Sequence, residues 1–167
     1  DFQRYPETFT RLEGLQAVGG RLQRLPGRHG GAVIHDAYNA NPASLAAALQ
    51  AVGAEPGRKW LVLGDMRELG PTAGALHAQS GQDACRAGFE RLYALGEHSQ
   101  AAAAAFGAGA THFATVEMLT AALERELHHS DAAPVVLVKG SRGMRMERVV
   151  AALAAPGAFS MAPGGHD

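Results

Sequence analysis

Four polar clusters in the sequence each follow directly after a short apolar run. They comprise residues 36–41, 64–68, 96–98 and 139–142. Their carboxylates, amides and cations are groups that bind ribose hydroxyls, phosphates and carboxylates. The sequence contains no G-x-x-x-x-G-K-[S/T] phosphate loop, no G-x-S-x-G turn and no G-x-G-x-x-G turn. The clusters therefore predict a site that binds a small anionic ligand, with no catalytic residue of its own.

The first cluster lies between a predicted buried strand and a predicted helix. Residues 32–36 are apolar until Asp36, and Asn41 is followed by proline and an Ala- and Leu-rich segment. Asparagine often caps a helix and proline often begins one, so Asp36, Tyr38 and Asn39 should lie beside a helix N-terminus, which favours anions. Asp36 could accept hydrogen bonds from a ribose or from nearby backbone in its turn. Asn41 could contact a ligand or serve only as the cap.

The last cluster places two cations, Lys139 and Arg142, around Gly140 and Ser141 at the predicted start of a helix. Backbone N–H groups and cations in this arrangement can hold a carboxylate or a phosphate. Alternatively, the two charges are solvated surface groups that contribute almost nothing to stability. The eight histidines have no metal-ligand spacing, and the single cysteine, Cys85, is expected to pack in the core.

The clusters are positioned by strands that alternate with helices. Apolar runs predict strands at residues 32–36, 59–63, 91–95, 112–114 and 134–138, and the short run at 21–25 before a Pro/Gly-rich turn predicts the first strand of a hairpin. Segments rich in Ala and Leu predict helices at residues 43–54, 72–87, 99–106, 116–127 and 144–155. This alternation predicts an α/β fold with three Rossmann-like layers: a mostly parallel sheet of about six strands, one antiparallel edge strand from a hairpin, and helices on both faces. The carboxyl ends of parallel strands share one edge, so the four clusters should meet there.

Composition excludes several classes of partner. The chain has 167 residues, with 15 Lys and Arg against 16 Asp and Glu, which leaves a charge of -1. We therefore expect no nucleic-acid or membrane partner, and no apolar run reaches the ~20 residues that span a bilayer. No signal peptide is visible, so a cytoplasmic protein is expected. The chain begins at Asp1 without Met, which suggests a piece of a longer protein.

Four stretches taken together resemble the C-terminal domain of the Mur ligase family. They are G-R-L at 20–22, D-A-Y-N-A-N-P at 36–42, G-D-M-R-E-L-G at 64–70 and K-G-S-R-G-M-R-M-E at 139–147. The resemblance covers residues 20–155, which leaves 1–19 as a linker or the end of a preceding domain. Residues 156–167 are rich in Pro and Gly and are predicted to be a disordered tail.

Within the family, the Y-N-A-N-P and K-G-S-R runs are similar to members that add D-alanyl-D-alanine to UDP-N-acetylmuramoyl-tripeptide in peptidoglycan synthesis. The resemblance implies one domain of an ATP-dependent ligase, expected as a monomer. ATP activates the tripeptide carboxylate as an acyl phosphate, and the dipeptide amine then displaces phosphate. The phosphate loop and the Mg²⁺ ligands belong to a central domain that these residues do not include. The chain alone is therefore expected to be inactive.

The resemblance also implies roles for single residues on the nucleotide side. Arg21 resembles the family arginine that reaches the ATP phosphates, and Asp36 the aspartate that accepts from the ribose hydroxyls. Tyr38, Asn39 and Asn41 are expected to line the nucleotide side of the cleft.

On the other side, Lys139, Ser141 and Arg142 occupy the loop where a sister ligase holds its incoming amino acid. They are candidates for binding D-alanyl-D-alanine. Asp65 and Glu68 could orient their own loop or take the dipeptide amine.

Two residues depart from the family pattern. His35 stands where an acidic residue is common, and Ala37 where a serine is common. Both departures could loosen the hydrogen bonds around the site, while Arg21 and Asp36 are retained.

Two other functions are compatible with the chain. One is a nucleotide-binding module without catalysis, which would bind ATP on its own. The other is a sister ligase with a different incoming substrate, of the folate-polyglutamate or diaminopimelate type. The Y-N-A-N-P and K-G-S-R runs argue against the second of these.

Overall fold

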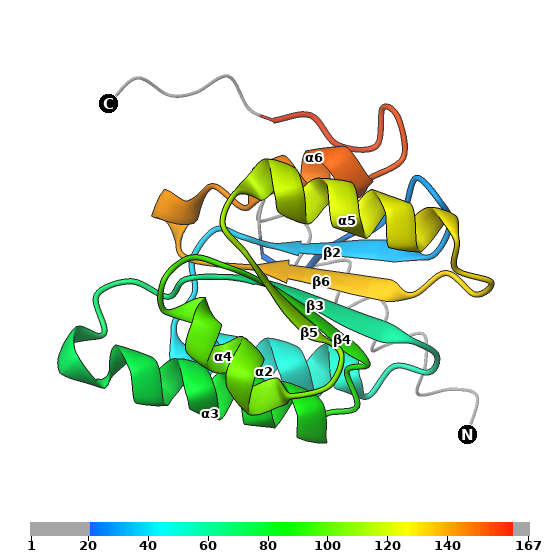
Figure 1. Ribbon diagram of the computed structural model, residues 1–167. Helices are drawn as coiled ribbons and strands as arrows, with labels where there is room; N and C mark the ends of the chain where they lie inside the picture. Colours follow the sequence, from blue (N-terminus) through cyan, green and yellow to red (C-terminus); the bar gives the residue numbers. More distant parts are fainter. Residues whose placement is uncertain (1–20, 162–167) are drawn as a thin grey trace, which may run out of the picture.

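Six strands form one sheet in the computed structural model, which describes residues 21–161 (Figure 1). The spatial order is β1-β2-β6-β3-β4-β5. Only β1 and β2 pair in antiparallel fashion, and the other neighbours are parallel. The predicted fold class is thus confirmed. The strand bounds are β1 Gln23–Pro26, β2 Ala32–Asp36, β3 Lys59–Gly64, β4 Arg91–Leu95, β5 Ala110–Phe113 and β6 Val135–Lys139.

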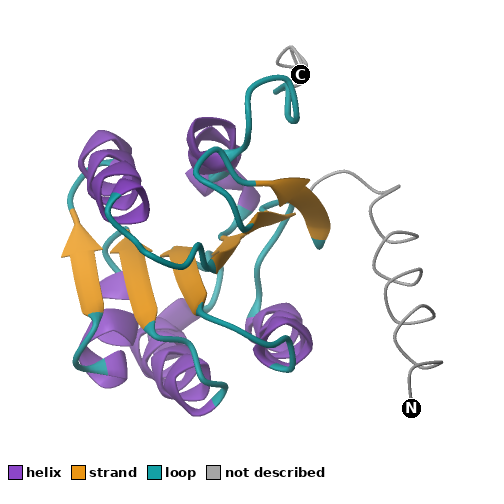
Figure 2. Ribbon diagram, turned by 90° about the vertical axis from the view of Figure 1, so that its right-hand side faces the viewer, coloured by secondary structure: helices purple, strands orange, loops and turns teal. Residues whose placement is uncertain are grey.

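Helices cover both faces of this sheet (Figures 1 and 2). One face carries α2 (Pro42–Gly53), α3 (Ala73–Arg86) and α4 (Ser99–Phe106). The other carries α5 (Val116–His128) and α6 (Glu147–Leu153). Among residues 21–161, no helix combines the length and the apolar character needed to cross a membrane.

Alternating side chains of the central strands supply two cores. Leu61 of β3 and Leu137 of β6 face α2 and α4, whereas Val62 and Val138 face α5 and α6. Successive residues of a strand point to opposite faces. Both faces are covered here, so these strands are apolar on both sides, which is why they stand out in the sequence as unbroken apolar runs.

The last helix is shorter than the predicted 144–155. Residues Arg142–Met144 form a short 3-10 turn, and Arg145 adopts a left-handed conformation with φ 53°. A left-handed residue cannot continue a right-handed helix, so α6 begins only at Glu147. Beyond α6, Phe159 packs edge-on against His35 with ring centroids 5.1 Å apart, so residues 158 and 159 of the predicted tail contact the core. Residues 162–167 of that segment lie outside the described part of the chain.

Cys85 is exposed, and its predicted place in the core was wrong. The buried positions of α3 include His77, Ser80, Gly81 and Ala84, which share one helical face. Each residue turns about 100° around the helix axis, so the residue after Ala84 points away from that face.

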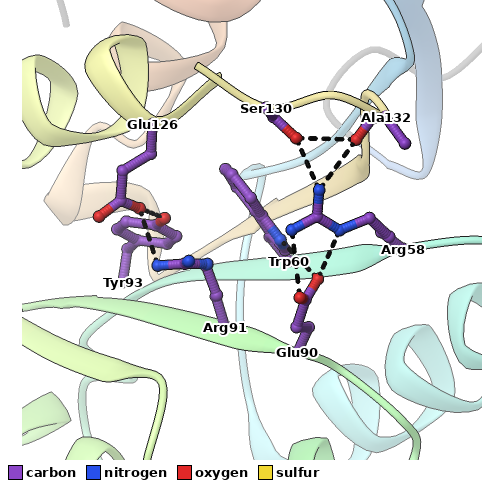
Figure 3. A network of polar contacts seen from close by, with 8 residues as sticks. All are labelled: Arg58, Trp60, Glu90, Arg91, Tyr93, Glu126, Ser130 and Ala132. Atoms are coloured by element: carbon purple, nitrogen blue, oxygen red, sulfur yellow. Dashed lines mark hydrogen bonds and ion pairs between the residues drawn. The ribbon is translucent and has the colours of Figure 1, made fainter. Parts of the chain in front are cut away.

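A polar network joins the amino ends of β3 and β4 (Figure 3). Arg58 donates to Glu90 at 2.8 Å, and Glu90 also accepts from the buried Trp60 indole at 3.3 Å. Arg91 binds Glu126 of α5 at 3.3 Å. The two arginines also lie 5.7 and 5.3 Å from the Trp60 ring. These charges pair with one another, so this end of the sheet is structural, whereas the polar clusters of the predicted site follow the carboxyl ends of the parallel strands.

We expect Gly81→Ala to lower the free energy of unfolding by about 1–3 kcal/mol, because overpacking forces backbone shifts. A Cβ at Gly81 would lie 2.1 Å from the carbonyl oxygen of Ala102 in α4. Urea unfolding followed by circular dichroism measures the change. Gly74→Ala in the same helix is the matched control, since nothing lies within 4 Å of its Cβ position. It should raise stability by up to about 1 kcal/mol, and equal effects for both variants would contradict this packing.

Candidate functional site

A buried ion pair joins the first and last polar clusters. Asp36 ends β2 and Lys139 ends β6, and the two residues are register partners in adjacent parallel strands. The Lys139 Nζ donates to Asp36 Oδ2 at 2.7 Å and to the Asn39 carbonyl oxygen at 3.2 Å. Lys139 is only 1% exposed. The two clusters that the sequence separates by about a hundred residues therefore meet in one place.

The ion pair lies where the topology opens a crevice. The chain leaves β2 toward α2 on one face and leaves β6 toward α6 on the other face. Ligands of open α/β sheets bind at such a switch point. A hollow of about 380 Å³ is found here, and its lining includes all five predicted nucleotide-side residues and one predicted dipeptide-side residue: Arg21, Asp36, Tyr38, Asn39, Asn41 and Lys139.

Asp36 keeps acceptor capacity for a ligand. One carboxylate oxygen accepts from Lys139, and the other accepts from the backbone N–H of Leu22 at 3.3 Å. An ionised carboxylate offers about four lone-pair sites, so further hydroxyl donors can be accommodated. The backbone donor comes from the segment before β1 and not from the turn that Asp36 begins.

The two asparagines shape the turn that leads into α2. Asn41 accepts from the Ser44 N–H at 2.8 Å, and the Ser44 hydroxyl accepts from the Asn41 N–H at 3.0 Å, which completes a capping box. Asn39 accepts from the Ala40 N–H at 2.9 Å. The first turn of α2 contains no acidic residue. No acidic side chain in that turn therefore neutralises the partial positive charge of the helix N-terminus, and Asn41 and Ser44 of this N-terminus line the hollow.

The Tyr38 ring lies close to both ligand-side arginines. Its side chain is 44% exposed, and the guanidinium carbons of Arg21 and Arg142 lie 4.6 and 5.6 Å from its ring centroid. Both distances fall within the range of cation–π attraction. The ring therefore contacts one residue from each predicted ligand group.

Ser141 ties three loops together at the carboxyl edge. Its N–H donates to the Asp65 carbonyl oxygen at 3.0 Å, and its hydroxyl accepts from the Arg67 N–H at 2.7 Å. The same hydroxyl donates to the Ala40 carbonyl oxygen at 3.4 Å. The loops after β2, β3 and β6 are held in one arrangement by this buried side chain.

Asp65 and Glu68 take different places in the loop after β3. The buried Asp65 carboxylate accepts from the N–H groups of His98 and Ser99 at 3.1 and 2.7 Å, and from the Ser99 hydroxyl at 2.7 Å. It thereby fixes the start of α4. Glu68 is exposed, with a left-handed φ of 62°. Of the two alternatives for this pair, Asp65 fits the loop-orienting role, and Glu68 remains accessible at the rim.

Sequence reasoning missed His77 as a support of the same loop. The ring is fully buried, its Nδ1 lies 2.7 Å from the Ala73 carbonyl oxygen, and its Nε2 accepts from the Met66 N–H at 3.0 Å. A carbonyl oxygen only accepts, so Nδ1 carries the proton and Nε2 is free to accept. A histidine on the apolar face of a helix has the same pattern as any core histidine, so no sequence signal distinguishes it. Within residues 21–161, no three His, Cys, Asp or Glu side chains are grouped to hold a metal ion.

The chain belongs to the Mur ligase family. Residues 20–142 match the sequence profile described as Mur ligase, glutamate ligase domain. Two relatives carry the name UDP-N-acetylmuramoyl-tripeptide--D-alanyl-D-alanine ligase. The protein of Escherichia coli (strain K12) is 40% identical over 142 residues, which are 85% of this chain and 31% of the relative. The protein of Bacillus subtilis (strain 168) is 33% identical over 148 residues, covering 83% of this chain and 31% of the relative.

A solved structure agrees with these sequence matches. A crystal structure of MurF from Acinetobacter baumannii has a TM-score of 0.72 with this chain at 31% sequence identity, covering 79% of this chain and 30% of that one. The chain thus spans less than a third of the length of these relatives. It corresponds to one domain of such a ligase.

We expect Lys139→Met to lower the free energy of unfolding by about 3–5 kcal/mol, because it leaves the Asp36 carboxylate buried without its partner. Urea denaturation at pH 7 measures the loss. Arg86→Met is the matched control, since Arg86 is exposed and forms a solvent-exposed ion pair with Asp83 at 3.6 Å and an exposed hydrogen bond to Gln82 at 3.5 Å. Its effect should stay within about 1 kcal/mol. A similar small loss for Lys139→Met would show that the buried pair does not hold the strand ends.

His35 makes stability depend on pH. Its side chain is 7% exposed, and its Nδ1 has no hydrogen-bond partner among residues 21–161. Burial lowers the pKa of His35 below its usual 6.5, and the negative charges of Glu147 and Asp36 only partly oppose this. His35 is therefore harder to protonate in the folded state than in the unfolded chain.

We expect stability to fall as the pH drops below about 6.5, with a contribution from His35 of at most about 1.4 kcal/mol per pH unit. His35→Leu should flatten this slope, as measured by unfolding at pH 5.0 to 8.0. Above about pH 7.5, where neither state binds the proton, the variant and the parent should have parallel profiles. An unchanged acid slope in the variant would exclude His35 as its source.

Proposed function

We propose that this chain is the C-terminal domain of an ATP-dependent ligase that joins D-alanyl-D-alanine to UDP-N-acetylmuramoyl-tripeptide in peptidoglycan synthesis. The observation that carries the proposal is the Asp36–Lys139 pair, which brings the two predicted ligand groups to one crevice. The names of the relatives and the Y-N-A-N-P and K-G-S-R runs support this substrate pair. ATP and a UDP-linked substrate place the reaction in the cytoplasm.

On the nucleotide side, Arg21 would bind the ATP phosphates and Asp36 the ribose hydroxyls. The hollow beside them and the uncompensated N-terminus of α2 support an anionic ligand there. Tyr38, Asn39 and Asn41 line the same hollow. The side-chain oxygens of the two asparagines already accept hydrogen bonds from backbone N–H groups. We therefore assign to both residues mainly the role of fixing the turn that lines the hollow.

On the dipeptide side, Arg142 would bind the terminal carboxylate of D-alanyl-D-alanine, because a guanidinium pairs with a carboxylate through two parallel hydrogen bonds. Glu68 is an exposed carboxylate of the neighbouring loop and is suited to the dipeptide amine. Lys139, Ser141 and Asp65 are buried in contacts that hold these loops. We assign to those three the positioning of the site.

The domain would act by positioning and charge. In the proposed reaction, the γ-phosphoryl group of ATP passes to the tripeptide carboxylate and ADP leaves. The dipeptide amine then attacks the acyl carbon, loses a proton and displaces inorganic phosphate. Holding the amine close to the acyl carbon can contribute roughly 7–11 kcal/mol in well-oriented cases. Closing the site also excludes water that would hydrolyse the acyl phosphate. We assign the phosphate loop and most Mg²⁺ contacts to the rest of the enzyme, on the family resemblance.

Phosphate release by the full-length enzyme tests the proposal. With ATP, Mg²⁺ and UDP-N-acetylmuramoyl-tripeptide, we expect turnover with D-alanyl-D-alanine and little with D-alanine, glutamate or diaminopimelate. Arg142→Ala should raise chiefly the KM for the dipeptide, and Arg21→Ala chiefly the KM for ATP. Losing one hydrogen-bonded charge contact costs about 1.5–3 kcal/mol, or roughly 10- to 150-fold.

Turnover with a single amino acid instead of the dipeptide would indicate a sister ligase. Binding of ATP by the 167-residue chain alone, without ligase activity of the full-length protein, would indicate a nucleotide-binding module. Swapped KM effects for the two arginine variants would overturn the assignment of the two sides.

A further inference from the structure

Tyr38 is exposed, whereas the other Phe, Tyr and Trp side chains among residues 21–161 are buried or half-buried. Met118 and Met161 are the other large apolar side chains exposed to a similar degree in that part of the chain. Tyr38 differs from both methionines because two guanidinium groups lie over its ring, at 4.6 Å for Arg21 and 5.6 Å for Arg142. These arginines come from opposite ends of the domain sequence.

Two guanidinium groups repel each other, and a shared aromatic ring offsets that repulsion. The face of the ring is electron-rich and attracts each cation, and the planar guanidinium also stacks on it. The attraction is electrostatic and comes from the ring itself, so the phenol hydroxyl is not required. An aliphatic side chain of similar size cannot replace it.

The backbone that carries Tyr38 is itself fixed. The next residue, Asn39, accepts from Lys139 through its carbonyl oxygen at 3.2 Å and from the Ala40 N–H through its side chain at 2.9 Å. The ring therefore stands on a turn that is anchored to the buried ion pair.

We propose that Tyr38 is a positioning residue that holds Arg21 and Arg142 at once, and so couples the nucleotide side of the site to the dipeptide side. This inference rests on the function proposed above. Neither the ring nor its hydroxyl takes part in bond making. Its removal should therefore weaken the binding of both ligands together, although the proposed function assigns the two arginines to different ligands.

Steady-state kinetics of the full-length enzyme test the coupling. Tyr38→Leu should raise the KM for ATP and the KM for D-alanyl-D-alanine, each about 2- to 5-fold, which corresponds to a cation–π attraction at an exposed site. Tyr38→Phe retains the ring and should rescue both KM values. Met118→Leu, an exposed apolar change on α5, is the control that should alter neither.

A second measurement does not depend on the reaction. In the full-length protein, the side-chain Nε–Hε resonances of Arg21 and Arg142, assigned through Arg→Lys variants, should carry ring-current shifts. Both shifts should be lost in Tyr38→Leu and kept in Tyr38→Phe.

The outcomes separate the two proposals. Loss of both ring-current shifts together with a rise in both KM values supports the coupling. A rise in only one KM, equal behaviour of the Leu and Phe variants, or unchanged arginine resonances in Tyr38→Leu overturns it. If the parent enzyme does not use D-alanyl-D-alanine, the proposed function fails, and the resonances still decide whether Tyr38 holds the two arginines.

Discussion

The rest of the site depends on one buried ion pair, Lys139 with Asp36. Burying two charges costs several kcal/mol for each ion, and only close geometry with additional hydrogen bonds compensates for that cost. Here the pair is 2.7 Å long, and the Asn39 carbonyl oxygen and the Leu22 N–H complete the bonding. These contacts fix the ends of β2 and β6 and the turn that carries Tyr38. The crevice keeps its shape because separating the ends of β2 and β6 would leave a buried charge without its partner.

The charged side chains at the two ends of the sheet differ in their partners and their exposure. At the amino end, arginines and glutamates pair with one another around Trp60 and join β3, β4 and α5 (Figure 3). At the carboxyl end, the guanidinium groups of Arg21 and Arg142 point over an exposed ring and remain accessible. Strand direction explains the division, because every parallel strand delivers its following loop to the same edge. A domain built this way presents its accessible charged groups on one edge of the sheet.

Several residues that resemble ligand contacts are turned inward. Lys139, Ser141 and Asp65 lie in the family motifs, yet each is buried and holds a neighbouring loop. A sequence motif shows that a position requires a certain residue type. Either a contact with a ligand or a contact that anchors a loop can be the reason for that requirement. Among the charged candidate residues, Arg21, Arg142 and Glu68 are exposed. A binding site on loops requires both kinds of residue, since loops without anchors would lose the arrangement that the ligand needs.

The sequence by itself determined the α/β class, most strand positions, the Asn41 cap and the edge where the polar clusters meet. Apolar runs, cap residues and strand-helix alternation act over short distances and can be recognised along the chain. Only the tertiary structure decided that Lys139 faces Asp36 and not solvent, that His77 supports the loop after β3, that Cys85 is exposed, and that Arg145 delays the last helix. Each of these depends on which side of an element meets another element. That is set by the packing of distant segments, which local sequence patterns do not encode.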